Sequence, residues 1–95
     1  MLVKVFIQRK IIPGHEEDFK RLLRELFIKA IHAEGFISGE TMQSTEEPTI
    51  HLTIGTWQSL AQWNSWINSP GRKEANEMFD NILSEPAKMA SFHYE

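Results

Sequence analysis

Apolar and polar residues alternate through the first dozen positions of the chain. One face collects Val3, Val5, Ile7 and Ile11, and the other collects Lys4, Phe6, Gln8 and Lys10. A period of two predicts a β-strand over residues 2–12. The Pro13-Gly14 pair that follows predicts a turn at its end.

The period then changes to that of a helix. Apolar residues recur three and four positions apart from Phe19 to Ile31, which predicts an amphipathic helix that ends near His32. The carboxylates at positions 16–18 stand in its first turn, where free N–H groups favour negative charge. These carboxylates therefore have a structural explanation and need no catalytic role.

Two further strands follow. Residues 36–45 predict a strand, residues 46–48 a turn, and residues 49–57 (TIHLTIGTW) a second strand. In the second of these strands, Ile50, Leu52 and Ile54 lie opposite His51, Thr53 and Trp57.

Two capping patterns predict the helices that come next. Ser59 with Gln62 three positions later forms a capping box, which opens a short helix to about Asn68. The Ser69-Pro70 pair reads as an N-cap followed by proline at the first helical position. The final residues, KMASFHYE, predict a short last strand.

The resulting order, β-α-β-β-α(α)-β, is typical of an α+β, ferredoxin-like fold with an antiparallel sheet. With right-handed crossovers the first and third strands lie side by side in the centre, and all helices cover one face. Ninety-five residues fit one domain, residues 1–95.

The other face of the sheet is expected to need a cover. On its two central strands we place Lys4, Phe6, Gln8, Lys10, His51, Thr53 and Trp57. This set is too aromatic for a fully solvated surface and too polar for an ordinary core. A second copy of the sheet would cover it, so we expect a homodimer.

Composition and charge narrow the function classes. The chain is 41% hydrophobic and 24% charged with a net charge of −3, which argues against a nucleic-acid partner. It contains no cysteine, and its four dispersed histidines match no zinc spacing, so no metal site and no cofactor are expected. We find no export signal and no apolar stretch long enough to enter a membrane, which makes the cytoplasm the expected location.

All three tryptophans fall within ten positions, in the segment WQSLAQWNSWINSPGR. Helical spacing assigns Trp63 to plain core packing, and leaves Trp66 either in a pocket wall or at the helix edge. Trp57, at a strand end, is expected to anchor the strand, with its indole N–H on a loop carbonyl. Arg72 falls inside an apolar helical stripe, where it either extends to solvent or turns inward as a fixed cation for an anionic ligand.

Few residues remain as catalytic candidates. The chain carries no Ser-His-Asp signature, no nucleophile elbow and no glycine-rich phosphate loop. An RNA-recognition module shares the βαββαβ order, but its aromatic signature is missing from TIHLTIGTW. His51 is a candidate base if a pocket reaches it, and otherwise a packed histidine of the interface.

The order of elements, the Pro-Gly turn into an acidic helix start, the phrase EGFISGET, and TWQSLAQWNSWINSPGR followed by a helix resemble the antibiotic biosynthesis monooxygenase (ABM) domain family over essentially the whole chain. The resemblance implies a dimeric α+β barrel with a ligand pocket between helices and sheet. Members include cofactor-free oxygenases of anthrones and quinol-like aromatics, and haem-degrading enzymes.

The haem-degrading branch is similar to this chain at Trp66 alone. Its iron-ligating histidine falls on Asn76 and its first-strand asparagine on Ile7. The resemblance therefore argues against haem degradation. Many other members carry a histidine where this chain has Trp66, so a proton-transfer role at that position is lost.

Two hypotheses of different class follow. In the first, the chain is a cofactor-independent monooxygenase of a small aromatic molecule: Trp57 and Trp66 stack on the ring, Arg72 and Asn76 stabilise an oxyanion, and His51 is the base. In the second, the same cavity binds or senses a small aromatic molecule without reaction.

Overall fold

The computed structural model covers residues 1–95 and contains seven regular elements. Their order is the predicted one, and each boundary lies within a few residues of its prediction. They are β1 (Val3–Lys10), α1 (Glu16–Ala30), β2 (Phe36–Gln43), β3 (Ile50–Trp57), α2 (Leu60–Ile67), α3 (Pro70–Asp80) and β4 (Lys88–His93).

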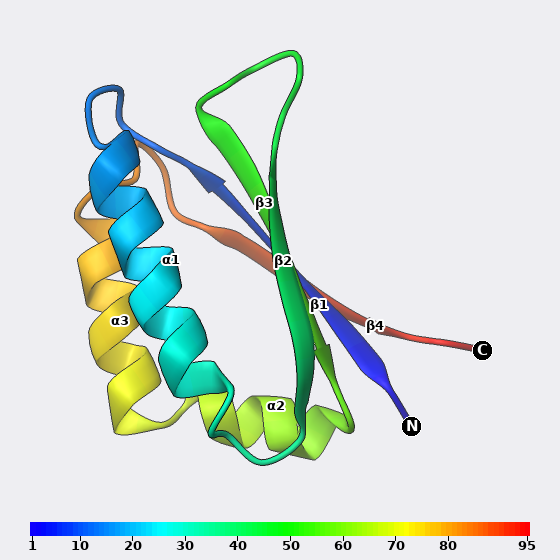
Figure 1. Cartoon of the computed structure of the whole chain (residues 1–95). Helices are drawn as coiled ribbons and strands as arrows, with labels where there is room; N and C mark the ends of the chain where they lie inside the picture. Colours follow the sequence, from blue (N-terminus) through cyan, green and yellow to red (C-terminus); the bar gives the residue numbers. More distant parts are fainter.

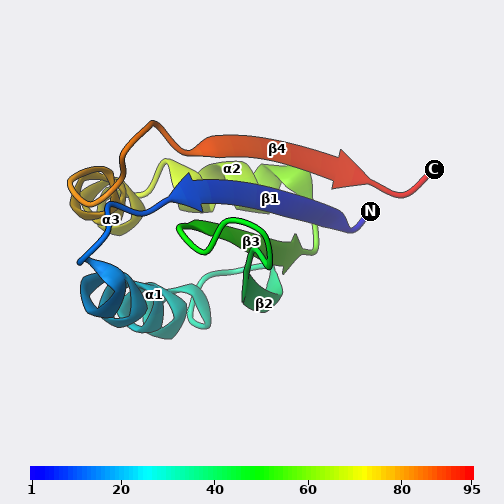
Figure 2. The same cartoon turned by 90° about the horizontal axis from the view of Figure 1, so that it is seen from above.

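The four strands form one antiparallel sheet in the order β2-β3-β1-β4. The predicted central position of the first and third strands is confirmed. All three helices lie on the same side of this sheet, with α1 and α3 packed against each other and α2 across the end at which β3 finishes (Figure 1). From above, the opposite side of the sheet is bare (Figure 2). The α+β, ferredoxin-like architecture is therefore confirmed.

The predicted helix starts are present in atomic detail. Ser59 Oγ accepts a hydrogen bond from the backbone N–H of Gln62 at 3.2 Å and donates one to the side-chain oxygen of Gln62 at 3.0 Å. Ser69 accepts from the N–H of Arg72, with Pro70 at the first helical position. Both caps satisfy N–H groups that a helix start would otherwise leave free.

Gly35, between α1 and β2, lies against the Gln62 side chain of this capping box. Gly35 has a φ of +89°, and a Cβ at this position would collide with the side chain of Gln62. The backbone conformation and the close approach both require glycine. The entry to β2 is thereby fixed against the start of α2.

The register corrects our assignment of faces on β3. Trp57 pairs with Val3, Thr53 with Ile7, and His51 with Arg9. Directly paired residues of an antiparallel sheet share a face, so His51, Thr53 and Trp57 face the helices. Their expected position on the outer face was wrong.

The outer face is consequently more apolar than expected. Opposite Lys4, Phe6, Gln8 and Lys10 it carries Thr56, Ile54, Leu52 and Ile50. The outer strands add Met42, which is 46% exposed, and Phe92, which is 59% exposed and packs edge-on against Phe6 at 5.4 Å. An open apolar surface of this extent is uncommon on a monomeric protein.

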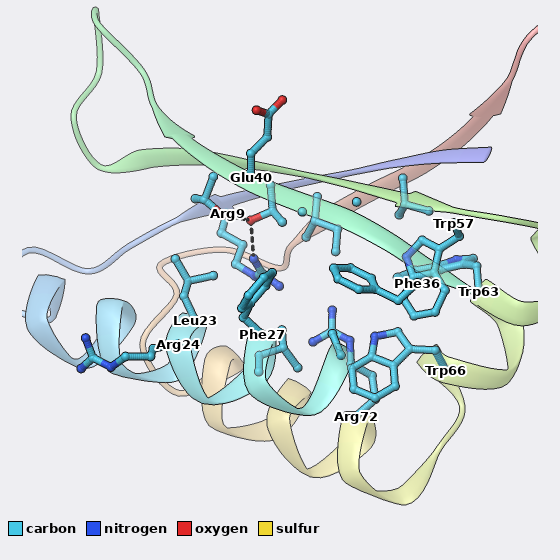
Figure 3. A pocket seen from close by; sticks show the side chains of 18 residues that line it. Arg9, Leu23, Arg24, Phe27, Phe36, Glu40, Trp57, Trp63, Trp66 and Arg72 are labelled. Carbon is cyan, nitrogen blue, oxygen red and sulfur yellow. Dashed lines mark hydrogen bonds between the residues drawn. The ribbon is translucent and has the colours of Figure 1, made fainter. Parts of the chain in front are cut away.

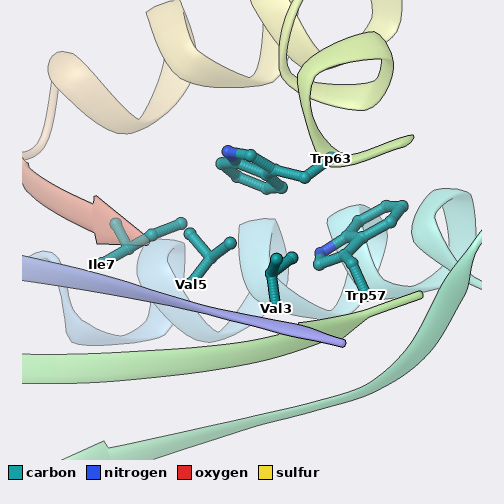
Figure 4. Close-up of a cluster of buried hydrophobic side chains, with 5 residues drawn as sticks. All are labelled: Val3, Val5, Ile7, Trp57 and Trp63. Carbon is teal, nitrogen blue, oxygen red and sulfur yellow. The ribbon is translucent and has the colours of Figure 1, made fainter. Parts of the chain in front are cut away.

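The core between helices and sheet consists of two separate clusters. The first joins Val3, Val5 and Ile7 of β1 to Trp57 and Trp63, and these five side chains lie together in Figure 4. The second joins Ile11, Phe19, Leu22, Phe79 and Ile82. Since α1 and α3 pack against each other at the second cluster, the space beside the first can remain open. None of the helices combines the length and apolarity needed to span a membrane.

Candidate functional site

A cavity of about 310 Å³ lies between the helix-facing side of the sheet and the helices. Its walls come from β1, β2 and β3 above and from all three helices below (Figure 3). Most of the lining is apolar or aromatic, which is typical of pockets for small organic molecules.

Two glycines on neighbouring strands explain why this space is not filled. Gly39 of β2 and Gly55 of β3 are direct pairing partners and both line the cavity. Neither contributes a side chain, whereas the flanking pairs are the large Phe36–Trp57 and the small polar Thr41–Thr53. The sheet therefore leaves room at this point, and the rings of Phe36 and Trp57 fill part of it where they approach Gly39 and Gly55.

The three tryptophans build the aromatic end. The ring of Trp57 lies 5.8 Å from that of Trp63 and 6.0 Å from that of Trp66, and all three line the cavity. Trp63 belongs to the core cluster, as its spacing predicted. The indole Nε1 of Trp57 lies over Gly55, so its expected contact with a loop carbonyl was wrong.

Arg72 turns inward. It shares one helical stripe with Ala75 and Phe79, all three buried, and its guanidinium points up into the cavity from α3 (Figure 3). Only 1% of this residue is exposed, and its Nε and Nη1 are buried without a hydrogen-bond partner. Burial lowers the pKa of Arg72 to about 10, so the group remains a cation at neutral pH.

A second buried arginine enters the same cavity from the sheet. Arg9 of β1 is 3% exposed, donates a hydrogen bond from Nη1 to the hydroxyl of Thr53 at 3.1 Å, and lies over the ring of Phe79 at 4.2 Å. Burial, and then the charge of Arg72, lower the pKa of Arg9 to about 9, against an opposing effect of Asp80. Our sequence analysis missed this residue, although it occupies the same alternating positions as Val5 and Ile7.

No anionic side chain forms an ion pair with these two cations, and Asp80 offsets only part of the charge of Arg9. None of the ion pairs in the chain includes Arg9 or Arg72. Glu40 is the one carboxylate residue in the lining, and its side chain points away from the cavity on the far side of β2 (Figure 3). Arg24 also borders the cavity but is exposed on α1.

His51 lies apart from the main cavity. Its ring packs against Phe19 at 4.7 Å, toward the end of the sheet that holds the second core cluster. Burial lowers its pKa, with a smaller opposing effect of Glu16 and a further lowering by Lys20. His51 therefore faces the helices but does not line the cavity.

Asn76 also lies elsewhere. It borders a second hollow of about 250 Å³ beside Asp80 and Phe79, and Arg9 is the residue that borders both spaces. Of the five residues predicted for the site, the main cavity therefore unites Trp57, Trp66 and Arg72. Nowhere in the chain do three His, Asp or Glu side chains gather as metal ligands would.

The arrangement can bind a flat aromatic ring and hold negative charge on it. Indole rings offer stacking surfaces, and two buried guanidinium groups without carboxylate partners favour an anion in a space of low dielectric constant. The lining has no histidine and no inward carboxylate, so it offers no side chain with the usual pKa of a general base.

Comparison with known proteins gives consistent results. The model of the antibiotic biosynthesis monooxygenase family matches residues 2–78. A 42.8 kDa protein in the whiE locus of Streptomyces coelicolor is 27% identical over 67 residues, which is 70% of this chain and 17% of that protein. The chain thus corresponds to a small part of that relative's length.

Two solved structures illustrate the likeness of fold. A conserved protein from Methanosarcina mazei superposes with a TM-score of 0.93 at 19% identity, covering 100% of this chain and 94% of the other. SnoaB, a cofactor-independent oxygenase from Streptomyces nogalater, superposes with a TM-score of 0.84 at 12% identity, covering 100% and 95%.

Proposed function

The chain belongs to the antibiotic biosynthesis monooxygenase family, and on this basis we propose that it is a cofactor-independent monooxygenase of a small anthrone- or quinol-like aromatic molecule. The observation that carries the proposal is the inward Arg72, buried and without a partner in an aromatic cavity. The family and a cofactor-independent oxygenase of the same fold support the reaction class.

The proposed reaction begins with ionisation of the substrate. An anthrone in its enol form, or a quinol, loses its O–H proton to water at the cavity opening. The charge of Arg72 stabilises the resulting oxyanion and thereby lowers the pKa of the substrate hydroxyl. Trp57 and Trp66 hold the ring in place. This route assigns no proton transfer to His51 or Asn76, which lie outside the cavity.

The electron-rich anion then reacts with dioxygen. One electron passes from the ring to dioxygen, and the two radicals combine in a carbon–oxygen bond. Loss of water from the resulting hydroperoxide leaves a carbonyl group. The peroxide anion first takes back from water the proton that ionisation released, and the water then lost contains this proton and the hydrogen of the oxidised ring carbon. One oxygen atom stays on the ring and the other leaves in that water, so the substrate supplies all the electrons.

A binding protein without turnover is the second candidate. The specific observation in its favour is that no histidine and no inward carboxylate lines the cavity. Such a protein would bind the same aromatic anions through the same arginine. It would show saturable quenching of tryptophan fluorescence with no loss of ligand.

Oxygen uptake separates the two candidates. Purified protein is incubated with a panel of anthrones and quinols, and dioxygen consumption is followed beside product formation. The monooxygenase proposal expects turnover above buffer that falls at least about tenfold in Arg72→Met, since a charge-assisted contact to the oxyanion is lost. Turnover that is absent, or unchanged in Arg72→Met, would contradict it.

We further propose that two copies associate through the outer face of the sheet. Phe6, Phe92, Leu52, Ile54 and Met42 give this face the apolar character of an interface. Light scattering at micromolar concentration tests the proposal: a dimer is expected, and Leu52→Lys should shift it to the monomer. A monomer in the unchanged protein would disprove it.

A further inference from the structure

The cavity holds more positive charge than the proposed reaction uses. One arginine is enough to stabilise a ring oxyanion, yet two are buried in the lining, Arg72 from α3 and Arg9 from β1. Both enter the same cavity, and the charge of Arg72 contributes to the lowered pKa of Arg9. Two like charges in a largely apolar space oppose folding unless each gains a partner.

The protein itself supplies little compensation, since Asp80 offsets part of the charge of Arg9 but forms no ion pair with it. The hydroxyl of Thr53 accepts one hydrogen bond from Arg9 and is also 2.9 Å from the hydroxyl of Thr41. The ring of Phe79 covers one face of the Arg9 guanidinium. For Arg72, Nε and Nη1 have no partner at all. A ligand with one negative charge would leave a cation unmatched.

We propose that the physiological ligand is an aromatic carboxylic acid, whose carboxylate binds between Arg9 and Arg72 while its ring stacks on the tryptophans. The proposal rests on the proposed function for the ring and its oxyanion, and adds the second negative group. Guanidinium groups suit a carboxylate because both are planar and both form paired hydrogen bonds.

The size of the cavity sets the scale of the ligand. About 310 Å³ is near the lower end of ligand pockets, roughly 300–1,000 Å³. The stretch from the tryptophans toward Arg9 is lined first by Val5 and the two glycines, and its polar groups, the hydroxyls of Thr41 and Thr53, lie at the Arg9 end beside Ile7. An acid of two or three fused rings, charged at its edge, matches this distribution.

Binding to matched probes tests the inference without any turnover. Tryptophan fluorescence is suitable because all three tryptophans of the chain line the cavity. We would titrate the protein under nitrogen with 2-naphthoate, with neutral 2-naphthamide of the same shape, with 2-naphthyl phosphate, and with acetate. The variants are Arg9→Gln and Arg72→Gln, with Arg21→Gln as the control, because Arg21 is an exposed arginine of α1 outside the cavity lining.

We expect 2-naphthoate to bind at least about tenfold more tightly than 2-naphthamide, because charge-assisted hydrogen bonds replace neutral ones. That preference should shrink to about threefold or less in Arg9→Gln and in Arg72→Gln, and persist in Arg21→Gln. Equal affinity of acid and amide in the unchanged protein would overturn the inference, and this comparison needs no variant to fold. Tighter binding of the phosphate than of the carboxylate would overturn the choice of group.

The two proposals fail separately. If the acid preference is found but no anthrone or quinol is oxidised, the carboxylate site stands and the monooxygenase proposal falls. If neutral anthrones are oxidised while acid and amide bind equally, the reverse holds.

Acetate alone should bind at least about a hundredfold more weakly than 2-naphthoate, because it lacks the ring that the tryptophans hold. Equal binding of acetate and 2-naphthoate would contradict the role of the aromatic wall.

Discussion

Replacing Arg72 with methionine should stabilise the unliganded protein while it removes anion binding. Methionine keeps an unbranched stem of similar length, so the packing beside Ala75 and Phe79 is retained. What disappears is a cation that is 1% exposed and has two nitrogens without partners. Most substitutions of buried residues destabilise, which makes the expected sign distinctive.

The magnitude follows from the pKa of this group. Burial lowers the pKa of Arg72 to about 10, well below that of a free arginine, and at ~1.4 kcal/mol per pKa unit this corresponds to about 3 kcal/mol against the buried charged form. Part of this penalty is relieved where the guanidinium meets the open cavity. We therefore expect Arg72→Met to raise the free energy of unfolding by about 2 kcal/mol, within the range measured for buried ions replaced by apolar residues.

Urea and thermal unfolding measure the effect. For a chain of this length, about 2 kcal/mol corresponds to a rise in Tm of roughly 8–16 °C, with an unchanged urea m-value. The folded pKa is below that of the unfolded chain, so the penalty is fully present below pH 10 and is relieved as pH rises above it. The gain should therefore be the same at pH 6 and pH 8.

Arg24→Met is the matched control, because this arginine is exposed at the cavity rim. Its stability should stay within about 0.5 kcal/mol of the unchanged protein. Destabilisation of Arg72→Met would refute the reasoning, since it would mean that the guanidinium is compensated inside the protein. If Arg72→Met gains stability but still binds 2-naphthoate as tightly as the unchanged protein, the stability argument holds and the binding argument is contradicted.

Three further predictions concern the hollow, the histidine and the turn. Gly39→Val adds a side chain at ordinary contact distance from Phe36 and should weaken 2-naphthoate binding at least about tenfold while changing stability by less than about 1 kcal/mol; fluorescence titration with full binding would contradict it. His51→Phe keeps a ring against Phe19 and removes a group whose pKa is lower in the folded than in the unfolded chain. In urea unfolding, the stability of this variant relative to the unchanged protein should therefore increase as pH falls below about 6.5. A pH-independent difference would disprove this. Gly35→Ala should cost more than about 1 kcal/mol of unfolding free energy and more than Gly14→Ala, because both have positive φ but only Gly35 approaches another side chain; equal losses would refute the collision.

The sequence predicted the tryptophan-rich wall of the cavity, but not the wall formed by β3, because the side of β3 that faces the helices was assigned wrongly. Alternation assigned the apolar side of β3, Ile50, Leu52 and Ile54, to the core, as it correctly did for β1. The register shows that this side faces outward and that Thr53 and Gly55 face the helices. The middle of the inner side of β3, Thr53 and Gly55, has no large apolar side chain because it lines a cavity, so polarity alone misled the assignment.

Arg9 was missed for a related reason. It follows Val3, Val5 and Ile7 at the same spacing, and that position alone predicted an inward side chain. A charged residue in such a series is usually ascribed to a strand end. Its place in the proposed ligand site follows only from the cavity that it shares with Arg72, which comes from a helix more than sixty residues later.

Local patterns in the sequence determined the order of elements, the helix caps and the placement of helices on one face, because each depends on neighbours a few positions apart. They also placed the three tryptophans on one segment. Tertiary structure alone decided which side of β3 faces the helices, that Gly39 meets Gly55 to leave a hollow, and that two arginines share it. These features depend on strand register and on contacts between distant segments, which no local periodicity encodes.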